Sequence, residues 1–210
     1  MKWQVIFMFH RMGQLFVRWS VRILLHVLFR VKYIGEKKLP EDGAYILCPN
    51  HRSLVDVPIA GTFSKKRWVY FMGKKELFEK RFSRFFMNLM DSFPVDRGKG
   101  DIGSIKKALS YLKNGEMICV FTQGTREKDG EELPARKGVA MLAAMSEAPI
   151  IPMYITGVIK PFHKITVYVG KPFDLGLRKK VKYSRETYEE KSQEIMSIIR
   201  GLAEVYKGDN

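Results

Sequence analysis

One histidine and one aspartate stand five residues apart in a polar stretch, Asn50-His51-Arg52-Ser53-Leu54-Val55-Asp56, that follows an apolar run. On a regular helix His51 and Asp56 would lie about 140° apart, so they can meet only if His51 lies in the turn before the helix. Pro49 and a candidate N-cap, Ser53, favour such a turn. A carboxylate on one imidazole nitrogen fixes the tautomer and leaves the other nitrogen as a base. Because no serine or cysteine nucleophile stands beside the pair, the spacing indicates direct activation of a substrate hydroxyl; a structural histidine is the alternative.

A second polar stretch runs from Phe121 to Arg126, after the run 116–120, which is apolar apart from Glu116. A turn built from Gly124, Thr125 and Arg126 at the end of a strand can offer backbone N–H groups, a hydroxyl and a guanidinium to a phosphate. In open α/β sheets, ligands bind at that edge. Taken alone, the stretch also fits a solvated turn.

The elements that must position these residues alternate between short apolar runs and helical patterns. This alternation predicts an α/β domain over residues 34–210, with a mostly parallel sheet flanked by helices. The expected strands are 45–48, 68–72, 117–121, 150–155 and 165–169; the expected helices are 54–63, 75–90, 102–114, 138–145 and 184–206.

Residues 1–33 contain no acidic residue and are rich in large apolar side chains. Arg18, Arg22, His26 and Arg30 recur every four residues, which on a helix gives one basic face with apolar residues around the rest. The pattern predicts an amphipathic, membrane-associating helical segment, which Gly13 could break into two helices. An ordinary surface helix packed on its own domain is the alternative.

The chain is strongly basic, with 37 Lys and Arg against 22 Asp and Glu in 210 residues, a net charge of +15. Such an excess favours a polyanionic partner: nucleic acid, an anionic membrane or a phosphorylated substrate. Cys48 and Cys119 lie inside apolar runs, which predicts small buried side chains in a reducing compartment. We expect no cleavable signal peptide, no spanning helix and no metal site.

Three further stretches complete an ordered set of motifs: Gly73-Lys74-Lys75-Glu76-Leu77, Phe93-Pro94-Val95-Asp96-Arg97-Gly98, and a proline-bounded apolar run at 148–154. In this order, the motifs resemble those of the 1-acylglycerol-3-phosphate acyltransferases, a glycerolipid acyltransferase family, over roughly residues 30–172. The resemblance implies a catalytic pair at His51 and Asp56. It matches the family's second block to Asp96 and Arg97 and its proline-centred fourth block to Ile151 and Pro152.

The third block of that family, usually Phe-Pro-Glu-Gly-Thr-Arg, matches Phe121 to Arg126 and implies binding of a glycerol phosphate. Thr122 and Gln123 depart from it, and Gln123 keeps an amide but loses the carboxylate. The implied phosphate-binding and supporting residues, beyond the catalytic pair, are Arg126, Thr125, Gly124, Lys74, Lys75 and Arg97 for the phosphate, with Asn50, Gln123 and Pro152 in support.

The implied reaction is transfer of an acyl group from an acyl thioester, either acyl-CoA or an acyl carrier protein, to the sn-2 hydroxyl of lysophosphatidic acid. The product is phosphatidic acid for phospholipid synthesis, and no cofactor is required. The expected location is the cytoplasmic face of a membrane, peripheral or monotopic, on an anionic lipid surface. The alternatives are acylation of another lysophospholipid or of glycerol 3-phosphate, and a non-catalytic basic protein that binds membrane or nucleic acid. We expect no nucleic acid partner, since no nucleic-acid-binding motif is found.

Overall fold

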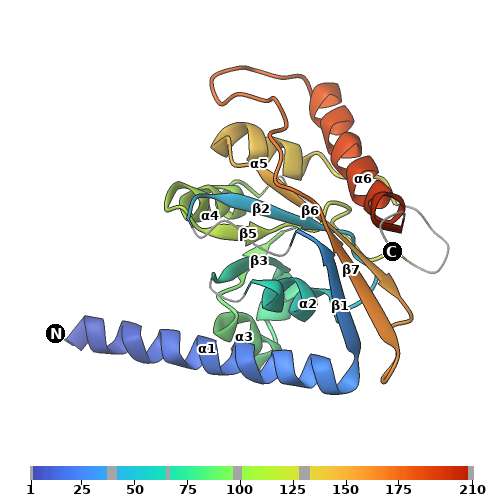
Figure 1. Ribbon diagram of the computed structural model, residues 1–210. Helices are drawn as coiled ribbons and strands as arrows, with labels where there is room; N and C mark the ends of the chain where they lie inside the picture. The colour runs from blue at the N-terminus through green and yellow to red at the C-terminus, as the bar shows by residue number, and fades with distance from the viewer. Residues whose placement is uncertain (1, 37–41, 65–66, 97–100, 128–132, 208–210) are drawn as a thin grey trace.

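Seven strands form one sheet in the computed structural model, which describes residues 2–36, 42–64, 67–96, 101–127 and 133–207. The strand order is β1-β7-β6-β2-β5-β3-β4, and every neighbouring pair is parallel except β6 with β7. The predicted α/β fold with a mostly parallel sheet is therefore confirmed (Figure 1). The strands are β1 (Arg30–Gly35), β2 (Tyr45–Pro49), β3 (Val69–Lys74), β4 (Phe93–Val95), β5 (Met117–Cys119), β6 (Ile150–Gly157) and β7 (Lys164–Val169).

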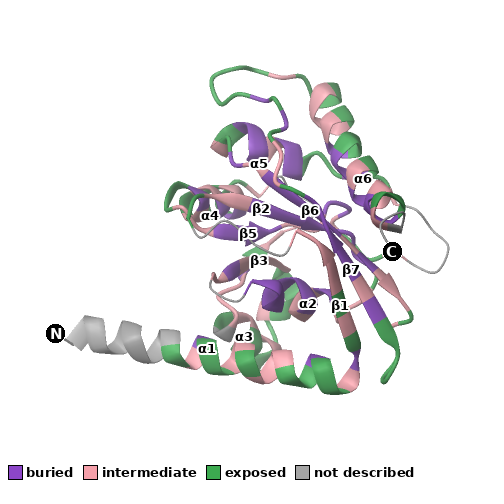
Figure 2. Ribbon diagram, viewed as in Figure 1, coloured by how far each residue is buried: buried purple, intermediate pink, exposed green. Residues whose placement is uncertain are grey.

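Helices cover both faces of this sheet (Figure 1). On one face lie α1 (Lys2–Leu28) and α2 (Asp56–Phe63), with α3 (Arg81–Leu89) beside them; on the other lie α4 (Ile102–Lys113), α5 (Gly138–Ser146) and α6 (Arg185–Lys207). The central strands are consequently buried from both sides (Figure 2). Adjacent residues of β2 show this, because Ile46 packs on the α4–α6 side and Leu47 on the α1–α2 side, each with no exposed surface. Burial on both faces explains why the strands read as continuous apolar runs.

The predicted helix over 75–90 is divided in two. A 3₁₀ turn, η1 (Lys75–Phe78), precedes α3, and between them Lys80 is extended. Ser83 Oγ donates to the Leu77 carbonyl at 2.6 Å, and Arg84 Nη2 donates to the Glu79 carbonyl at 3.1 Å. These side chains bond the backbone of η1 and its end and so stabilise the break. The short strand β4 was not predicted, and β5 ends at Cys119 rather than at Phe121.

The N-terminal segment differs from the prediction at three points. Helix α1 runs unbroken through Gly13 and ends at Leu28, and β1 begins at Arg30, so the predicted boundary at residue 33 falls inside a strand of the sheet. Residues 30–33 alternate between basic and apolar side chains, which is the period of a strand. The prediction of a single basic face on this helix is also wrong, because the Arg18 side chain is turned toward the domain. Its Nη1 donates to the Arg67 carbonyl at 2.8 Å.

The outward side of α1 is apolar instead. Exposed fractions are 68% for Phe16, 64% for Trp19 and 63% for Val27, while Leu25 is buried against the domain. Within the described residues, no helix is both long and apolar enough to cross a bilayer.

Candidate active site

The His51 and Asp56 side chains meet at the end of β2. His51 Nδ1 lies 3.1 Å from Asp56 Oδ2, and both residues are buried. Asp56 is the first residue of α2, whereas His51 lies in the turn before it, as the spacing required. Because a carboxylate oxygen can only accept, this contact places the proton on Nδ1 and leaves Nε2 with a free lone pair.

Asp56 also shapes the turn that carries the histidine. Its Oδ2 accepts hydrogen bonds from the backbone N–H groups of Arg52 and Ser53, both at 2.6 Å. The residue that caps α2 is Val55, and Ser53 Oγ accepts from the Val55 N–H at 3.2 Å, so the prediction that Ser53 is the N-cap is wrong. One carboxylate therefore orients the imidazole and stabilises the backbone that supports it.

The ring of His51 stacks on Phe121, with centroids 4.1 Å apart and planes at 28°. Phe121 follows β5, which pairs directly with β2. The stack and the Asp56 contact together limit rotation of the imidazole, so its reactive edge has a fixed direction. Sequence reasoning included Phe121 in a motif but assigned it no role.

The second motif forms a tight turn against the histidine backbone. Gln123 Oε1 accepts from the His51 N–H at 3.0 Å, and the Glu127 N–H donates to the His51 carbonyl at 2.8 Å. Gly124 has φ +68°, and a Cβ there would lie 2.8 Å from Arg136 Cδ, so glycine suits both the conformation and the space. Beyond it, Thr125 and Arg126 are exposed to solvent.

Lys74, the last residue of β3, and Lys75, the first residue of η1, occupy the same edge of the sheet. Strands β2, β5 and β3 are parallel neighbours, so their carboxyl ends lie side by side, with β3 about 10 Å from β2. Lys74 is exposed and pairs with Glu76 at 3.0 Å, and Lys75 Nζ lies 3.8 Å from Asp96 Oδ2. The Lys74–Lys75 and Asp96 motifs are thus brought together, whereas Arg97 lies outside the described residues.

Two predicted supporting residues have structural places. Asn50 extends β2 by bonding β6, since its Nδ2 donates to the Ile155 carbonyl at 3.0 Å and its Oδ1 accepts from the Ile155 N–H at 2.7 Å. Pro152 is buried in β6 opposite Cys48, and its carbonyl accepts from the Gly170 N–H at 3.0 Å. Asn50 therefore holds the start of the turn that carries His51, and Pro152 belongs to the core of the sheet.

Two residues near the site were missed by sequence reasoning. The Glu127 side chain accepts a hydrogen bond from Gln123 Nε2 and lies 3.4 Å from Arg200 Nη2 of α6. The only sequence signal was a carboxylate four residues after a glutamine that replaces a usual glutamate.

The two cysteines are fully buried, as predicted. Burial raises the pKa of the Cys48 thiol. It also raises the pKa of Cys119, and there the nearby Cys48 and Asp56 add to the rise. Both thiols are therefore protonated and neither is a nucleophile at neutral pH. In the described part of the chain, no group of three or more His, Cys, Asp or Glu side chains could hold a metal ion.

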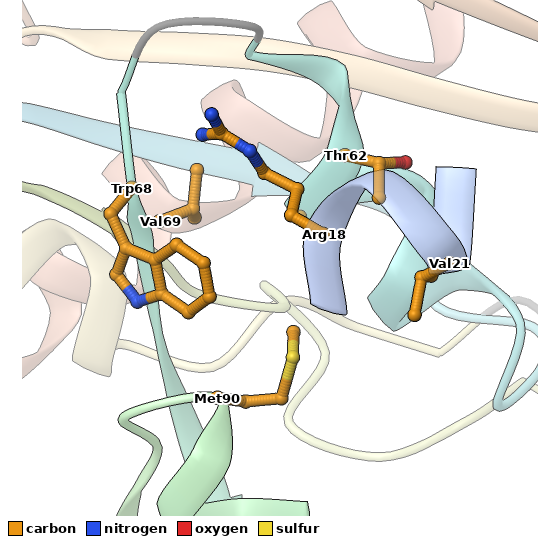
Figure 3. Close-up of a pocket in the computed structure, with 7 residues that line it drawn as sticks. Arg18, Val21, Thr62, Trp68, Val69 and Met90 are labelled. Carbon is orange, nitrogen blue, oxygen red and sulfur yellow. The ribbon is translucent and has the colours of Figure 1, made fainter. Parts of the chain in front are cut away.

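A small pocket lies under α1, between that helix, α2 and β3 (Figure 3). Arg18 and Val21 from α1 face Trp68, Val69 and Met90 across it. None of the residues predicted to bind substrate lines this pocket, which is separate from the histidine.

A sequence profile described as acyltransferase matches residues 30–156, more than half of the chain. The chain belongs to the acyltransferase family. The profile spans β1 to β6 and thus includes His51, Asp56 and the turn after β5. The resemblance inferred from the ordered motifs is confirmed.

Individual proteins similar to this acyltransferase carry names that agree with the family assignment. A Bacillus subtilis protein named 1-acyl-sn-glycerol-3-phosphate acyltransferase is 31% identical over 66% of the chain and 68% of its own length. A Streptococcus pneumoniae protein of the same name is 28% identical over 81% of the chain and 66% of its own length. The crystal structure of the 1-acyl-sn-glycerophosphate acyltransferase PlsC from Thermotoga maritima matches with a TM-score of 0.63 and 26% identity, covering 83% of this chain and 71% of that one.

Proposed function

We propose that this acyltransferase moves an acyl group from an acyl thioester to the sn-2 hydroxyl of lysophosphatidic acid and releases phosphatidic acid. The observation that carries the proposal is the His51–Asp56 pair, oriented and buried at the carboxyl edge of the sheet beside a Gly-Thr-Arg turn whose Thr125 and Arg126 are exposed. The names of the relatives from Bacillus and Streptococcus support this acceptor. Acyl-CoA and acyl carrier protein are both anionic, and the basic chain suits either donor.

In the proposed reaction, His51 Nε2 takes the proton of the acceptor hydroxyl while the hydroxyl oxygen attacks the thioester carbonyl. The tetrahedral intermediate then breaks its C–S bond, and the departing thiolate recovers the proton from the imidazolium. Asp56 supports the positive ring throughout, because its Oδ2 contacts Nδ1. General-base catalysis of this kind contributes about 10²–10⁴-fold in rate.

The phosphate of the acceptor is assigned to the turn after β5. Arg126 supplies a bidentate cation, and Thr125 and Gly124 supply a hydroxyl and a backbone N–H group. Lys74 and Lys75 add positive charge from the end of the neighbouring strand β3. Arg97, which lies outside the described residues, is assigned to the phosphate from the family resemblance alone. Such a clamp contributes to the rate by holding the hydroxyl close to the base.

The proposed place of the reaction is the cytoplasmic surface of a membrane, with α1 lying in one leaflet. The outward residues of α1 are large and apolar, and Arg22 lines a depression together with Leu15, Phe16 and Trp19. Apolar and cationic side chains in this arrangement suit the boundary between acyl chains and anionic headgroups.

Helix α3 adds a second apolar surface near α1. Its Phe82, Phe85 and Phe86 are 79%, 62% and 44% exposed. The Gln14 side chain donates to Asp91 just beyond the end of α3, so the two helices are neighbours. We include this phenylalanine stripe, defined as these three residues, in the surface that contacts lipid.

The deciding experiment incubates the full chain with labelled lysophosphatidic acid and either acyl-CoA or acyl carrier protein charged with the same chain. Formation of phosphatidic acid supports the proposal, and the relative rates identify the donor. Parallel reactions with glycerol 3-phosphate and with other lysophospholipids measure acceptor preference. Faster acylation of any of these than of lysophosphatidic acid rejects the proposed acceptor.

The same assay tests the assigned residues. His51→Ala and Asp56→Asn should each lower turnover by orders of magnitude in a folded protein. Arg126→Ala should raise KM for the phosphorylated acceptor more than KM for the donor, by about 10–100-fold, because a charge-assisted contact is worth about 1.5–3 kcal/mol. Lys113→Ala, a lysine on α4, is the control for loss of a surface cation.

A further inference from the structure

Gln123 of the second motif is paired with a carboxylate four residues further along the chain. Gln123 is 1% exposed, and its Oε1 accepts from the His51 backbone N–H at 3.0 Å. That contact fixes the orientation of the amide, so Nε2 has to point away from His51 and needs an acceptor. Glu127 supplies it, since its Oε1 receives the Nε2 hydrogen bond.

Glu127 is itself held in place from two directions. Its backbone N–H donates to the His51 carbonyl at 2.8 Å, so the catalytic residue is bonded through both its N–H and its carbonyl. Its side chain, 15% exposed, lies 3.4 Å from Arg200 Nη2 of α6. A continuous path of contacts therefore joins α6 to the backbone of His51 through Arg200, Glu127 and Gln123.

We propose that Glu127 is a positioning residue that holds the backbone of His51, through Gln123 and through its own N–H group. The inference rests on the proposed acyl transfer for its kinetic test only. A glutamate at 123 could still accept from the His51 N–H, but its second oxygen would face the Glu127 carboxylate. Two carboxylates would then meet in a buried place, and either their repulsion or the uptake of a proton between them at neutral pH costs free energy. The amide at 123 and the carboxylate at 127 are thus complementary, and each identity depends on the other.

Complementarity predicts a specific pattern among three variants. Gln123→Glu places a second carboxylate beside Glu127 and should lower kcat by about tenfold, because the two carboxylates repel each other. Coupling of this size is found within one hydrogen-bond network. Glu127→Gln keeps an acceptor for Nε2 and should lower kcat by only about threefold, the order of a weakened hydrogen bond. The double variant Gln123→Glu, Glu127→Gln reverses the pair and should return to within about twofold of the wild type.

The experiment measures kcat and both KM values for the four proteins, with Glu204→Gln, an exposed glutamate on α6, as the control for loss of one negative charge. A positioning role changes kcat and leaves both KM values within about twofold, because only the transition state depends on the exact place of the base. Full activity in Gln123→Glu, or a double variant whose loss is the product of the two single losses, overturns the proposal.

A second measurement needs no substrate. The backbone amide of His51 should exchange its hydrogen faster in Gln123→Glu than in the wild type, and slowly again in the double variant, as followed by NMR. If the wild type does not acylate lysophosphatidic acid, the proposed function fails while this measurement still decides the pairing. Equal exchange rates in all four proteins would reject the Gln123–Glu127 pair whatever the enzyme acts on.

Discussion

Helices α1 and α6 are both long and amphipathic, yet their apolar sides face opposite ways. On α6, Ile195, Met196 and Ile199 are at most 1% exposed and pack in the core beneath that helix. On α1, Phe16 and Trp19 point away from the protein, with 68% and 64% of their surface exposed. Amphipathic spacing therefore gives each helix two sides but does not say which medium covers the apolar one.

Polar side chains explain the orientation of α1. On its inner side Gln14 is buried and bonds Asp91, and Arg18 bonds the Arg67 carbonyl. Gln14 and Arg18 thus form hydrogen bonds with the rest of the protein, whereas most of the surface of Phe16 and Trp19 is exposed. The proposal that lipid covers the outer side of α1 rests on this arrangement, in which polar side chains face the protein and large apolar side chains face away from it.

The largest expected effect comes from placing a charge on the buried side of α6. Ile199→Asp puts an unpaired carboxylate at a position with no exposed surface and should cost more than about 4 kcal/mol of unfolding free energy, enough to unfold a marginal domain. Ile23→Asp, the matched change on the exposed side of α1, should alter that free energy by no more than about 0.5 kcal/mol. Thermal unfolding in mild detergent measures both. Equal destabilisation by the two variants would mean that the outer side of α1 is covered by protein.

Much of this fold was predictable from sequence because the strands are short, apolar and separated by clear helical patterns. The errors have physical causes. β1 was read as the end of a helix because Arg30 continued the four-residue basic spacing of Arg18 and Arg22. β4 was missed because three residues, one of them Pro94, carry too little pattern to identify a strand.

The site was predictable where two residues at one short spacing are enough to identify a pair of interacting side chains. His51 and Asp56 could be paired from a five-residue interval, since only a turn before a helix allows them to meet. The partners from distant parts of the chain could not. Nothing in the spacing brings Arg200 of α6 to Glu127, because that contact depends on how α6 packs on the sheet.

The next largest effect is expected at the outer side of α1. Trp19→Ser should weaken binding of the full chain to lipid vesicles by about 10–100-fold, because a large apolar side chain moved out of water contributes about 1.5–3 kcal/mol. Vesicle flotation measures the partition coefficient. Ser197→Ala on α6 is a control that leaves the apolar side of α1 intact. A Trp19 variant that floats as well as the wild type would remove α1 from the lipid contact.

A smaller effect is expected from the phenylalanine stripe of α3. Phe82→Ser should weaken vesicle binding by about tenfold, within the range for one apolar side chain, and leave unfolding unchanged because this residue is 79% exposed. Combined with Trp19→Ser, the two losses should multiply, since the residues lie on different helices and act on the same surface. No further loss in the double variant would show that α3 stays out of the bilayer.

The smallest effect concerns the cations next to that stripe. Lys80 and Arg81 are exposed at the start of α3, where they would meet lipid headgroups if the phenylalanines enter the bilayer. Each basic residue near an anionic surface contributes about 1 kcal/mol, so Lys80→Gln should weaken binding to anionic vesicles by about fivefold. The same change should have no effect on neutral vesicles, and its effect on anionic ones should vanish at high salt, where screening is complete within a few ångströms. Lys113→Gln, on α4 across the sheet from α1, is the matched control.

Because the apolar contribution of α1 does not depend on salt, the protein itself should remain bound to vesicles when the Lys80 effect has gone. Release of the wild type by salt alone would instead mean that charge, and not the exposed apolar side of α1, holds this acyltransferase to lipid.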